Sequence, residues 1–422
     1  MNRNLSLKAS HFSEFLIIIL PISLLFSNIV SEAIIFILIL VLFINIDKKT
    51  LKNNFNSKIF FFLLFLSAYF IINYFVNFDK DPSFLRSFFF IRFPVYTFAI
   101  YLLLDYFKIN LKRIFICWFF TLLIILFDIF FQYIFGKNLF GYQSILHGDF
   151  MRLGGFLDDE LKIANLIIHF FVPIFSYFHF KSELNKKNIF LLFLFFFVTY
   201  IIVLLTGERS NFITFSVFIF LYVLFTNLRK FLIYFIIIGT PFVLILSQTL
   251  DDGLKKRMTN NIFNSYKESF FADSEKGFLY KKNIYFAHYS AALQINQDYP
   301  LFGVGLKNFR VFCKDEKYKF KIHPHFQDQY CSTHPHNFYF EIISEAGYLG
   351  LVIFIFSFFY FFYKFFNYSF KNKNYFLFGN SLILLLFFLP ILPRGSFFTN
   401  WNAMIFWTIF GFCIYSYKQL KR

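Results

Sequence analysis

Charged residues are scarce in this chain of 422 residues: Asp, Glu, Lys and Arg make up only 15%, whereas hydrophobic residues make up 58%. A soluble domain of this size cannot bury so much apolar surface in its core. The composition therefore excludes a soluble protein and indicates an integral membrane protein.

The chain also lacks a convincing cleavable signal peptide, an internal repeat and a nucleotide-binding fingerprint. Its first apolar run is followed at once by another without a small-residue cleavage site, so we expect a first membrane helix there. The paired repeats that many transporters carry are not recognisable. The glycine turn at 300–305 is too short for a dinucleotide fingerprint and follows a predicted helix rather than a strand.

Only four cysteines are present, and two of them lie in apolar runs, where we expect inert packing. The other two, Cys313 and Cys331, are 18 residues apart in a polar stretch. In an oxidising compartment they can form a disulfide, although two free thiols are the alternative. A zinc site with His334 and His336 is a third reading, but its spacing fits no usual zinc pattern. The chain has no other cluster of metal-ligand type, so no metal is predicted.

Apolar runs dominate what the chain does contain. Because lipid requires every backbone group to be bonded within the segment, these runs predict membrane helices, with ends uncertain by a few residues. The fold class is an all-α polytopic membrane protein with about 12 transmembrane helices. The predicted spans are 12–31, 32–46, 58–76, 84–105, 113–135, 161–180, 189–205, 211–227, 231–249, 338–362, 376–392 and 397–417.

Basic residues are unevenly divided between the two sets of connectors. One set, with the two termini, holds 20 Lys and Arg, whereas the opposite short connectors hold 5. The positive-inside rule then places both termini in the cytoplasm and the long stretch 250–337 outside. Much of the net charge of +17 is thus explained by topology, which argues against a nucleic-acid partner.

This topology divides the chain into three parts. Residues 1–249 carry transmembrane helices 1–9, residues 250–337 form a large periplasmic loop domain, and residues 338–422 carry helices 10–12. The loop is expected to fold as a small helical cap between helices 9 and 10. Within it, 280–297 reads as an amphipathic helix ended by Pro300.

A histidine-bearing segment, 334–337, stands at the end of the loop, directly before an apolar span. A histidine near its reference pKa can accept a proton at neutral pH, which general-base catalysis requires. This makes His336 a candidate base, and Asn337 can orient a substrate or cap the following helix. The alternative for His336 is a loop histidine bonded to backbone, and His334 beside it keeps the choice open.

Arg209 lies in a tight turn, 206–210, between two predicted spans. Its planar, permanently charged guanidinium suits a phosphate or diphosphate at the membrane surface. Pairing with Glu208 or with lipid headgroups is the alternative.

Arg86 and Arg92 belong to the fourth predicted span. A charge at the centre of a membrane helix costs about 2.5–3.5 kcal/mol on insertion scales, so such residues usually face protein or a polar cavity. Their six-residue separation is roughly 9 Å along a helix. We expect a polar cavity open to the outer face. The alternative is snorkelling by Arg86 and a buried pair for Arg92, with Asp128 as a possible partner.

Residues 151–160 form another external segment, which combines Arg152, a glycine turn and three acids that include Glu160. These residues can help to line the site. Alternatively, the acids simply stabilise the N-terminus of the sixth helix.

Together these pieces resemble the O-antigen ligase and polymerase superfamily of polytopic bacterial glycosyltransferases. The superfamily signature is His, then Asn, Ser or Gln, then nine residues and Gly; His336, Asn337, residues 338–346 and Gly347 fit it. Segment 298–305 is similar to the proline–glycine turn of the superfamily, and 207–210 to its arginine-bearing turn. The resemblance is strongest over about 200–360 and is weak before 150.

The resemblance implies transfer of a glycan from an undecaprenyl-diphosphate carrier to an acceptor sugar hydroxyl, without a metal or another cofactor. It implies a site on the periplasmic face of the bacterial inner membrane. His336 would be the catalytic base. The residues expected to bind the diphosphate are Arg209, Arg310, Arg92 and Arg86, and the supporting residues are Asn337, Arg152, Glu160 and His334.

One feature of the superfamily has no direct counterpart here. Its ligases carry a second functional arginine in the loop ahead of the glycine turn, whereas this loop offers Arg257 well ahead and Arg310 just after. Arg310 is the preferred candidate, and His288 or Lys282 could substitute.

The sequence does not decide which molecule accepts the glycan. A ligase would join finished glycan to lipid A–core, whereas a polymerase would extend a growing glycan. A membrane transporter is the alternative from a different class, but it predicts internal symmetry and polar residues at mid-membrane. The expected partners are therefore the carrier-linked glycan, its acceptor and membrane lipids.

Overall fold

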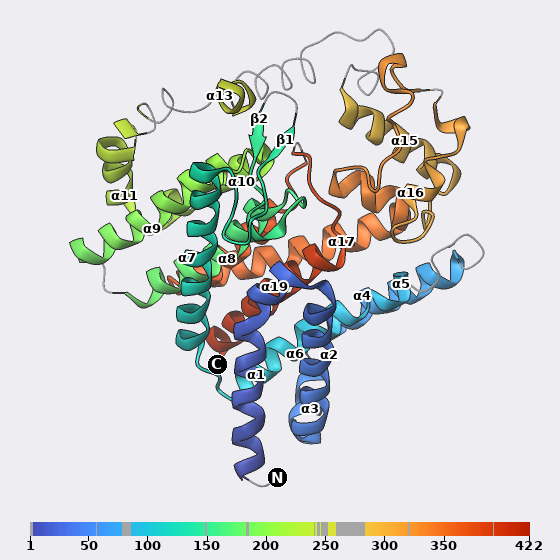
Figure 1. Cartoon of the computed structure of the whole chain (residues 1–422). Helices are drawn as coiled ribbons and strands as arrows, with labels where there is room; N and C mark the ends of the chain where they lie inside the picture. Colours follow the sequence, from blue (N-terminus) through green and yellow to red (C-terminus); the bar gives the residue numbers. More distant parts are fainter. Residues whose placement is uncertain are drawn as a thin grey trace.

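The computed structural model describes residues 3–422 except 56, 78–85, 148–149, 183–184, 240, 243–244, 246–251, 259–282, 320 and 391. Figure 1 shows a helical molecule with the N-terminus at its lower end and α13, α15 and the two short strands at its upper end. The helices up to α9 are α1 (Arg3–Phe26), α2 (Asn28–Asn45), α3 (Lys48–Phe55), α4 (Lys58–Val76), α5 (Arg86–Phe89), α6 (Arg92–Tyr106), α7 (Leu111–Phe135), α8 (Ile163–Lys181) and α9 (Lys186–Leu205).

The remaining elements include short pieces as well as long helices. The further helices are α10 (Arg209–Phe225), α11 (Arg229–Tyr234) with a π turn (Phe235–Gly239), α13 (Asp252–Met258), α15 (Ile284–Asp298), α16 (Phe309–Phe312), α17 (Phe338–Lys371), α18 (Tyr375–Leu386) and α19 (Asn400–Lys421). Short 3-10 turns cover Gly155–Leu157, Glu316–Lys319 and Pro324–Phe326.

Within the described residues, 8 helical segments are long and apolar enough to cross a membrane. They are Leu7–Phe26, Asn28–Asn45, Lys58–Val76, Arg86–Tyr106, Leu111–Phe135, Ile163–Lys181, Lys186–Leu205 and Phe338–Lys371. The helices α10 and α18 are apolar but shorter. Of the predicted ninth span, 231–249, residues 240, 243–244 and 246–249 lie outside the described residues. The prediction of an all-α polytopic membrane protein is confirmed, whereas the count of 12 stays a prediction.

Two local features differ from the sequence prediction. The first two spans separate at Ser27 rather than near residue 31, because the Ser27 side chain caps α2 by accepting a hydrogen bond from the Val30 N–H. Two short antiparallel strands, β1 (Ile145–His147) and β2 (Phe150–Arg152), interrupt the all-helical pattern. The second strand thereby positions Arg152.

The polar stretch after residue 282 has its own apolar core. Buried side chains of α15, including Ala291 and Ile295, pack with Val304, Phe309 and Tyr330. Cys313 belongs to this cluster and forms a disulfide with Cys331, at a Cα–Cα separation of 5.2 Å. This disulfide ties the start of the loop that carries the histidines to α16. The predicted helix at 280–297 is observed as α15, which ends just before Pro300.

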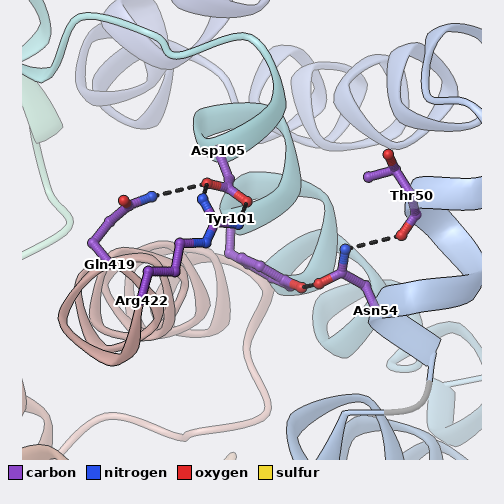
Figure 2. A network of polar contacts seen from close by, with 6 residues as sticks. All are labelled: Thr50, Asn54, Tyr101, Asp105, Gln419 and Arg422. Carbon is purple, nitrogen blue, oxygen red and sulfur yellow. Dashed lines mark hydrogen bonds and ion pairs between the residues drawn. The ribbon is translucent and has the colours of Figure 1, made fainter.

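The opposite end of the molecule is held by a polar network that joins three helices (Figure 2). The Arg422 guanidinium binds both carboxylate oxygens of Asp105 on α6, at 2.6 and 2.5 Å. Gln419 of α19 also donates to Asp105, at 2.8 Å. Tyr101 of α6 donates to Asn54 of α3. The chain terminus is thus fixed against α6 by a charge-assisted, bidentate contact.

Candidate functional site

The long helix α17 is broken at one residue, and this break explains the nine-residue spacing of the histidine motif. Asn337 caps the start of the helix by accepting from the Tyr339 N–H. Gly347, ten residues later, adopts φ 69° and ψ −175°, which interrupts the helix. Only glycine adopts this conformation readily. The motif therefore delimits a helical segment of two and a half turns, roughly at 3.6 residues per turn.

The proline–glycine turn at 300–305 docks into this break. The N–H groups of Val304 and Gly305 donate to the carbonyls of Ser344 and Glu345, and the Tyr348 N–H donates to Pro300 O at 2.8 Å. A side chain on Gly347 would collide with the Leu301 carbonyl. The two motifs of the resemblance are thus one interlocked structure, in which the turn satisfies backbone groups that the break leaves free.

His336 lies directly before this segment, in a left-handed conformation with φ 59°. Such a conformation is uncommon for a residue other than glycine and is held only when its surroundings impose it. Here the His336 carbonyl accepts from the Arg394 N–H at 2.7 Å. The imidazole Nε2 lies 3.2 Å from the Ser332 hydroxyl.

Two further histidines surround the His336 ring. Its centroid is 4.1 Å from that of His334 and 5.3 Å from that of His288 on α15. Tyr285, one turn before His288, lies 5.7 Å away in an edge-to-face arrangement. Sequence reasoning left His288 as a substitute cation; its Nδ1 instead bonds the Tyr330 carbonyl at 2.9 Å.

The environment keeps these rings uncharged. Burial, with help from His334 and His288, lowers the pKa of His336 to about 3. Burial also lowers the pKa of His334 to about 4, and nearby Arg310 and Lys307 add to that shift. At neutral pH His336 is therefore unprotonated, as a general base requires.

Arg394, in the connector between α18 and α19, is a residue that sequence reasoning counted only as a topology marker. Its backbone binds both histidines: its N–H donates to His336 O, and its carbonyl lies 3.1 Å from His334 Nε2. Its guanidinium donates to the Thr214 hydroxyl on α10 at 2.6 Å. Arg394 thus connects the histidine segment to the helix that Arg209 begins.

The Arg209 side chain has no hydrogen bond or ion pair to another residue in the described part of the chain. Glu208 beside it is buried and turned elsewhere: one carboxylate oxygen accepts from the Ala164 N–H at 2.8 Å and the other from Asn211 at 2.6 Å. The pairing of Arg209 with Glu208 that the sequence left open is therefore not formed. The Arg209 guanidinium is available for an anion.

Arg152 lies close to this group. Its guanidinium donates to the Leu161 carbonyl at 3.3 Å, and its buried Nε has no partner among the described residues. Burial lowers the pKa of Arg152, and the charges of Glu208 and Arg209 act on it as well. Glu160, in contrast, pairs with Lys162 and is exposed, so nothing in the structure brings it to the histidines.

A second group of cations lies near His334. Lys307 follows the glycine turn, Arg310 is on α16, and Arg86 begins α5. Burial lowers the pKa of Lys307 to about 8, and the charges of Arg310 and Arg86 add to this shift. Arg310 has a buried Nε without a partner in the described part of the chain. Neither Arg86 nor the Lys307 ammonium forms an ion pair with another described residue.

Arg92 differs from these cations because it is neutralised. Its guanidinium forms two 2.7 Å bonds with the Glu32 carboxylate on α2, and only 12% and 18% of the two side chains are exposed. Burial of a paired charge is the alternative that the sequence left open for Arg92. The partner of Arg92, however, is Glu32 and not Asp128. Asp128 instead accepts a hydrogen bond from the Leu139 N–H.

Arg86, Arg92 and Lys307 line a groove of about 430 Å³. Its other walls come from α2, from Phe89 and Phe90, from Leu306, and from the segment before α19. The predicted polar cavity at Arg86 and Arg92 is therefore present, and it combines cations with phenylalanine side chains.

No group of three or more His, Cys, Asp or Glu residues that could hold a metal ion occurs in the described part of the chain. The zinc reading of the cysteines and histidines has no support, because both thiols are consumed in the disulfide. Lys282, one of the substitute cations, lies outside the described residues.

Sequence reasoning missed Lys307, Arg394 and Tyr285. Lys307 follows the glycine turn directly, which is a signal that could have been used, because the turn docks beside the histidine motif. No local signal marks Arg394 or Tyr285. Their positions depend on how distant segments meet.

Comparison with known families identifies one match. Residues 192–355 match the sequence profile of the O-antigen ligase family. The matched range includes Arg209, the glycine turn, all three clustered histidines and Gly347. A search of curated proteins finds no match to the chain.

Proposed function

Because residues 192–355 identify this chain as a member of the O-antigen ligase and polymerase superfamily, we propose that it transfers a glycan from undecaprenyl diphosphate to an acceptor sugar hydroxyl. The observation that carries this proposal is a partly buried, uncharged histidine cluster with cations nearby that lack ion-pair partners among the described residues. Such cations indicate an anionic ligand. A neutral histidine near them is suited to a proton transfer.

His336 would accept the proton of the acceptor hydroxyl while that oxygen attacks the anomeric carbon. The bond between the anomeric carbon and the diphosphate oxygen then breaks, and undecaprenyl diphosphate leaves with the electron pair. General-base assistance of this kind typically contributes 10²–10⁴-fold. His334 and Arg394 would hold the His336 backbone, and Asn337 would fix the start of α17.

Arg209 would hold the departing diphosphate, with Arg152 beside it and Arg310 on the histidine side. Negative charge grows on the diphosphate as the glycosidic bond breaks, so preorganised cations stabilise the transition state more than the ground state. Arg86 and Arg92, the other predicted diphosphate residues, line the groove, and Glu32 already neutralises Arg92. The proposal needs no metal ion for this step.

The proposed site faces the periplasm, with both termini in the cytoplasm of a bacterial inner membrane. The division of basic residues supports this orientation. Residues 250–337 would form the periplasmic cap over the membrane helices 1–249 and 338–422. The separate core around Ala291 and the disulfide support such a cap.

Transfer by the purified protein in liposomes tests this function. The donor is a carrier-linked glycan, and the expected products are glycosylated acceptor and undecaprenyl diphosphate in equal amounts. Product on lipid A–core identifies a ligase, and longer carrier-linked chains identify a polymerase. Lipopolysaccharide gels of a deletion strain provide the cellular counterpart: rough core with accumulated long polymer indicates the ligase, and core with one repeat the polymerase. Absence of both products would contradict the proposal.

A further inference from the structure

Three consecutive residues, 330–332, contact two of the clustered histidines. The Tyr330 carbonyl lies 2.9 Å from His288 Nδ1. Because a carbonyl only accepts, this nitrogen of His288 carries a proton. The Ser332 hydroxyl lies 3.2 Å from His336 Nε2. One short segment of the loop thus reaches both rings.

The disulfide between Cys313 and Cys331 fixes this segment at its middle residue. Cys331 stands between the two residues that contact the histidines, and Cys313 is fully buried in the apolar core of the loop. The Tyr330 hydroxyl adds a further contact by donating to the Asp315 carbonyl at 3.2 Å. A cross-link removes conformations of the chain beside it, so the position of the Ser332 hydroxyl, one residue later, is restricted.

The two ring nitrogens of His336 have different surroundings. Nε2 faces the Ser332 hydroxyl. Nδ1 forms no hydrogen bond to another residue in the described part of the chain, and it is not one of the buried polar atoms that lack a partner there. The Nδ1 edge of the ring is therefore the edge that a substrate can reach.

A neutral imidazole carries its proton on one nitrogen and a lone pair on the other. If Ser332 donated to Nε2, the hydroxyl would occupy the lone pair that a base needs, and the reachable Nδ1 would carry a hydrogen. If Ser332 accepts from Nε2–H, the lone pair lies on the reachable nitrogen. Only the second arrangement suits a base whose partner arrives from outside the ring's own contacts.

We propose that Ser332 is a positioning residue whose hydroxyl accepts the His336 Nε2–H, so that Nδ1 takes the proton of the acceptor hydroxyl. The disulfide holds Ser332 in place for this contact. The inference rests on the proposed transferase function and adds the reacting atom and the residue that orients it.

The contact with Ser332 strengthens during the reaction. The acceptor oxygen bonds to the anomeric carbon, and its proton passes to His336 Nδ1. The bond from that carbon to the diphosphate oxygen breaks, and its electron pair leaves with undecaprenyl diphosphate. The imidazole is then positively charged, so its Nε2–H donates to Ser332 in a charge-assisted hydrogen bond. Ser332 therefore stabilises the transition state more than the ground state.

Nitrogen NMR of the full chain in liposomes tests the tautomer without turnover. The chain carries isotope-labelled histidine, and comparison with His336→Gln identifies the His336 signals. The wild type should carry the proton on Nε2. In Ser332→Ala that proton should exchange with water at least about tenfold faster, and a form protonated on Nδ1 should appear. Ser332→Thr keeps the hydroxyl and should resemble the wild type. A wild-type proton on Nδ1, or an unchanged spectrum in Ser332→Ala, would overturn the proposal.

Transfer kinetics test the consequence of this tautomer. Ser332→Ala should lower kcat by at least about tenfold with little change in either substrate KM, because the contact acts in the transition state. Ser332→Thr should recover most of that rate. Ser290→Ala is the matched control, because the Ser290 hydroxyl of the same loop donates to the Lys321 carbonyl instead. Wild-type kcat in Ser332→Ala, with all variants matched in thermal unfolding, would contradict the positioning role.

The part played by the disulfide is tested in a second background. In a Cys313→Ser/Cys331→Ser variant, Ser332→Ala should lower kcat by a smaller factor than in the wild type, because the hydroxyl is no longer held. The same factor in both backgrounds would contradict the role of the disulfide.

Failure of this inference is distinguishable from failure of the proposed function. If His336→Ala loses transfer while Ser332→Ala keeps it, the transferase function stands and the positioning role fails. If Ser332 determines the His336 tautomer but His336→Ala transfers at the wild-type rate, the tautomer assignment stands and the proposed role of His336 fails.

Discussion

The two ends of this molecule handle buried polar groups in opposite ways. Near the C-terminus, Asp105 accepts from both Arg422 and Gln419, so its charge is matched (Figure 2). At the histidine end, Arg209 and Lys307 have no ion-pair partner among the described residues. Matched charges connect helices, whereas unmatched charges cost free energy until a ligand arrives. This difference supports the proposal that function lies at the histidine end.

The largest effect is expected at His336. His336→Ala removes the proton acceptor, so transfer should fall by about 10²–10⁴-fold. Lipopolysaccharide gels of a deletion strain complemented with this variant should resemble those of the empty strain. His325→Ala is the matched control, since His325 is an exposed histidine of the same loop. Equal loss in both variants would indicate damage to the loop rather than loss of a base.

Arg209 should have the next largest effect. Arg209→Gln removes a cation from the developing diphosphate charge and should lower kcat by about 10²–10³-fold. Arg209→Lys should recover only part of the rate, because an ammonium cannot form the bidentate contact. Arg422→Gln, at the matched end, should leave steady-state transfer unchanged. A full recovery by lysine would contradict bidentate recognition.

Arg394 connects the histidine segment to α10 through the Thr214 hydroxyl. Thr214→Val tests that connection. Loss of a hydrogen bond to a charged group should lower kcat by about tenfold, while the donor KM changes little. Thr199→Val is a close control, because both hydroxyls bond their own helix but only Thr214 also accepts from Arg394. If both variants lose the same activity, the coupling between α10 and the histidines is not needed.

His336 and Lys307, both at the histidine end, should affect the pH dependence of transfer in opposite ways. Since the lowered pKa of His336 is about 3, its base form is present above that value. The profile of kcat/KM should therefore lack an acidic limb between pH 5.5 and 7. A limb near the reference histidine pKa, about 6.5, would show that His336 titrates freely.

Lys307 should give a basic limb. Its pKa of about 8 means that the groove loses a positive charge as pH rises through 8. The facing groups are Arg310 and Arg86, which favour this loss, and Glu345 and Glu341, which oppose it. The KM of the phosphate-bearing substrate that meets Lys307 should rise several-fold above pH 8. Lys307→Arg should abolish the rise, because arginine stays charged; a rise that persists in this variant would exclude Lys307 as its source.

The smallest effect is expected at the matched end. Asp105→Asn removes a partly exposed ion pair and should lower the free energy of unfolding by about 1 kcal/mol or less. Glycan transfer should stay at the wild-type rate. Urea unfolding monitored by circular dichroism, together with transfer assays, measures both quantities. A large loss of activity with unchanged stability would contradict the division between the two ends.

Much of this arrangement could be predicted from sequence because it depends on local patterns. The apolar runs predicted the helical membrane fold, and the family profile at 192–355 confirms the resemblance based on His336 and Gly347. The spacing alone, however, did not reveal why nine residues separate the two motif positions. The reason is a contact between the break at Gly347 and a turn more than forty residues earlier in the chain.

Residues whose positions depend on distant segments could not be predicted. Arg394 reaches His336 because the connector after α18 folds back over the start of α17. The partner of Arg92 proved to be Glu32, sixty residues earlier, because α2 packs against α6. Amino-acid composition and hydrophobic periodicity describe one segment at a time, whereas these contacts depend on how several helices are arranged.

Release of undecaprenyl diphosphate in a single turnover tests the central claim most directly. Purified wild type and His336→Ala, with matched thermal unfolding, are mixed in liposomes with a carrier-linked glycan and a saturating acceptor. The wild type should release the carrier diphosphate with formation of an equal amount of glycosylated acceptor, and His336→Ala should do so at least about 100-fold more slowly. Release and transfer at the wild-type rate by His336→Ala would contradict the assignment of His336 as the base.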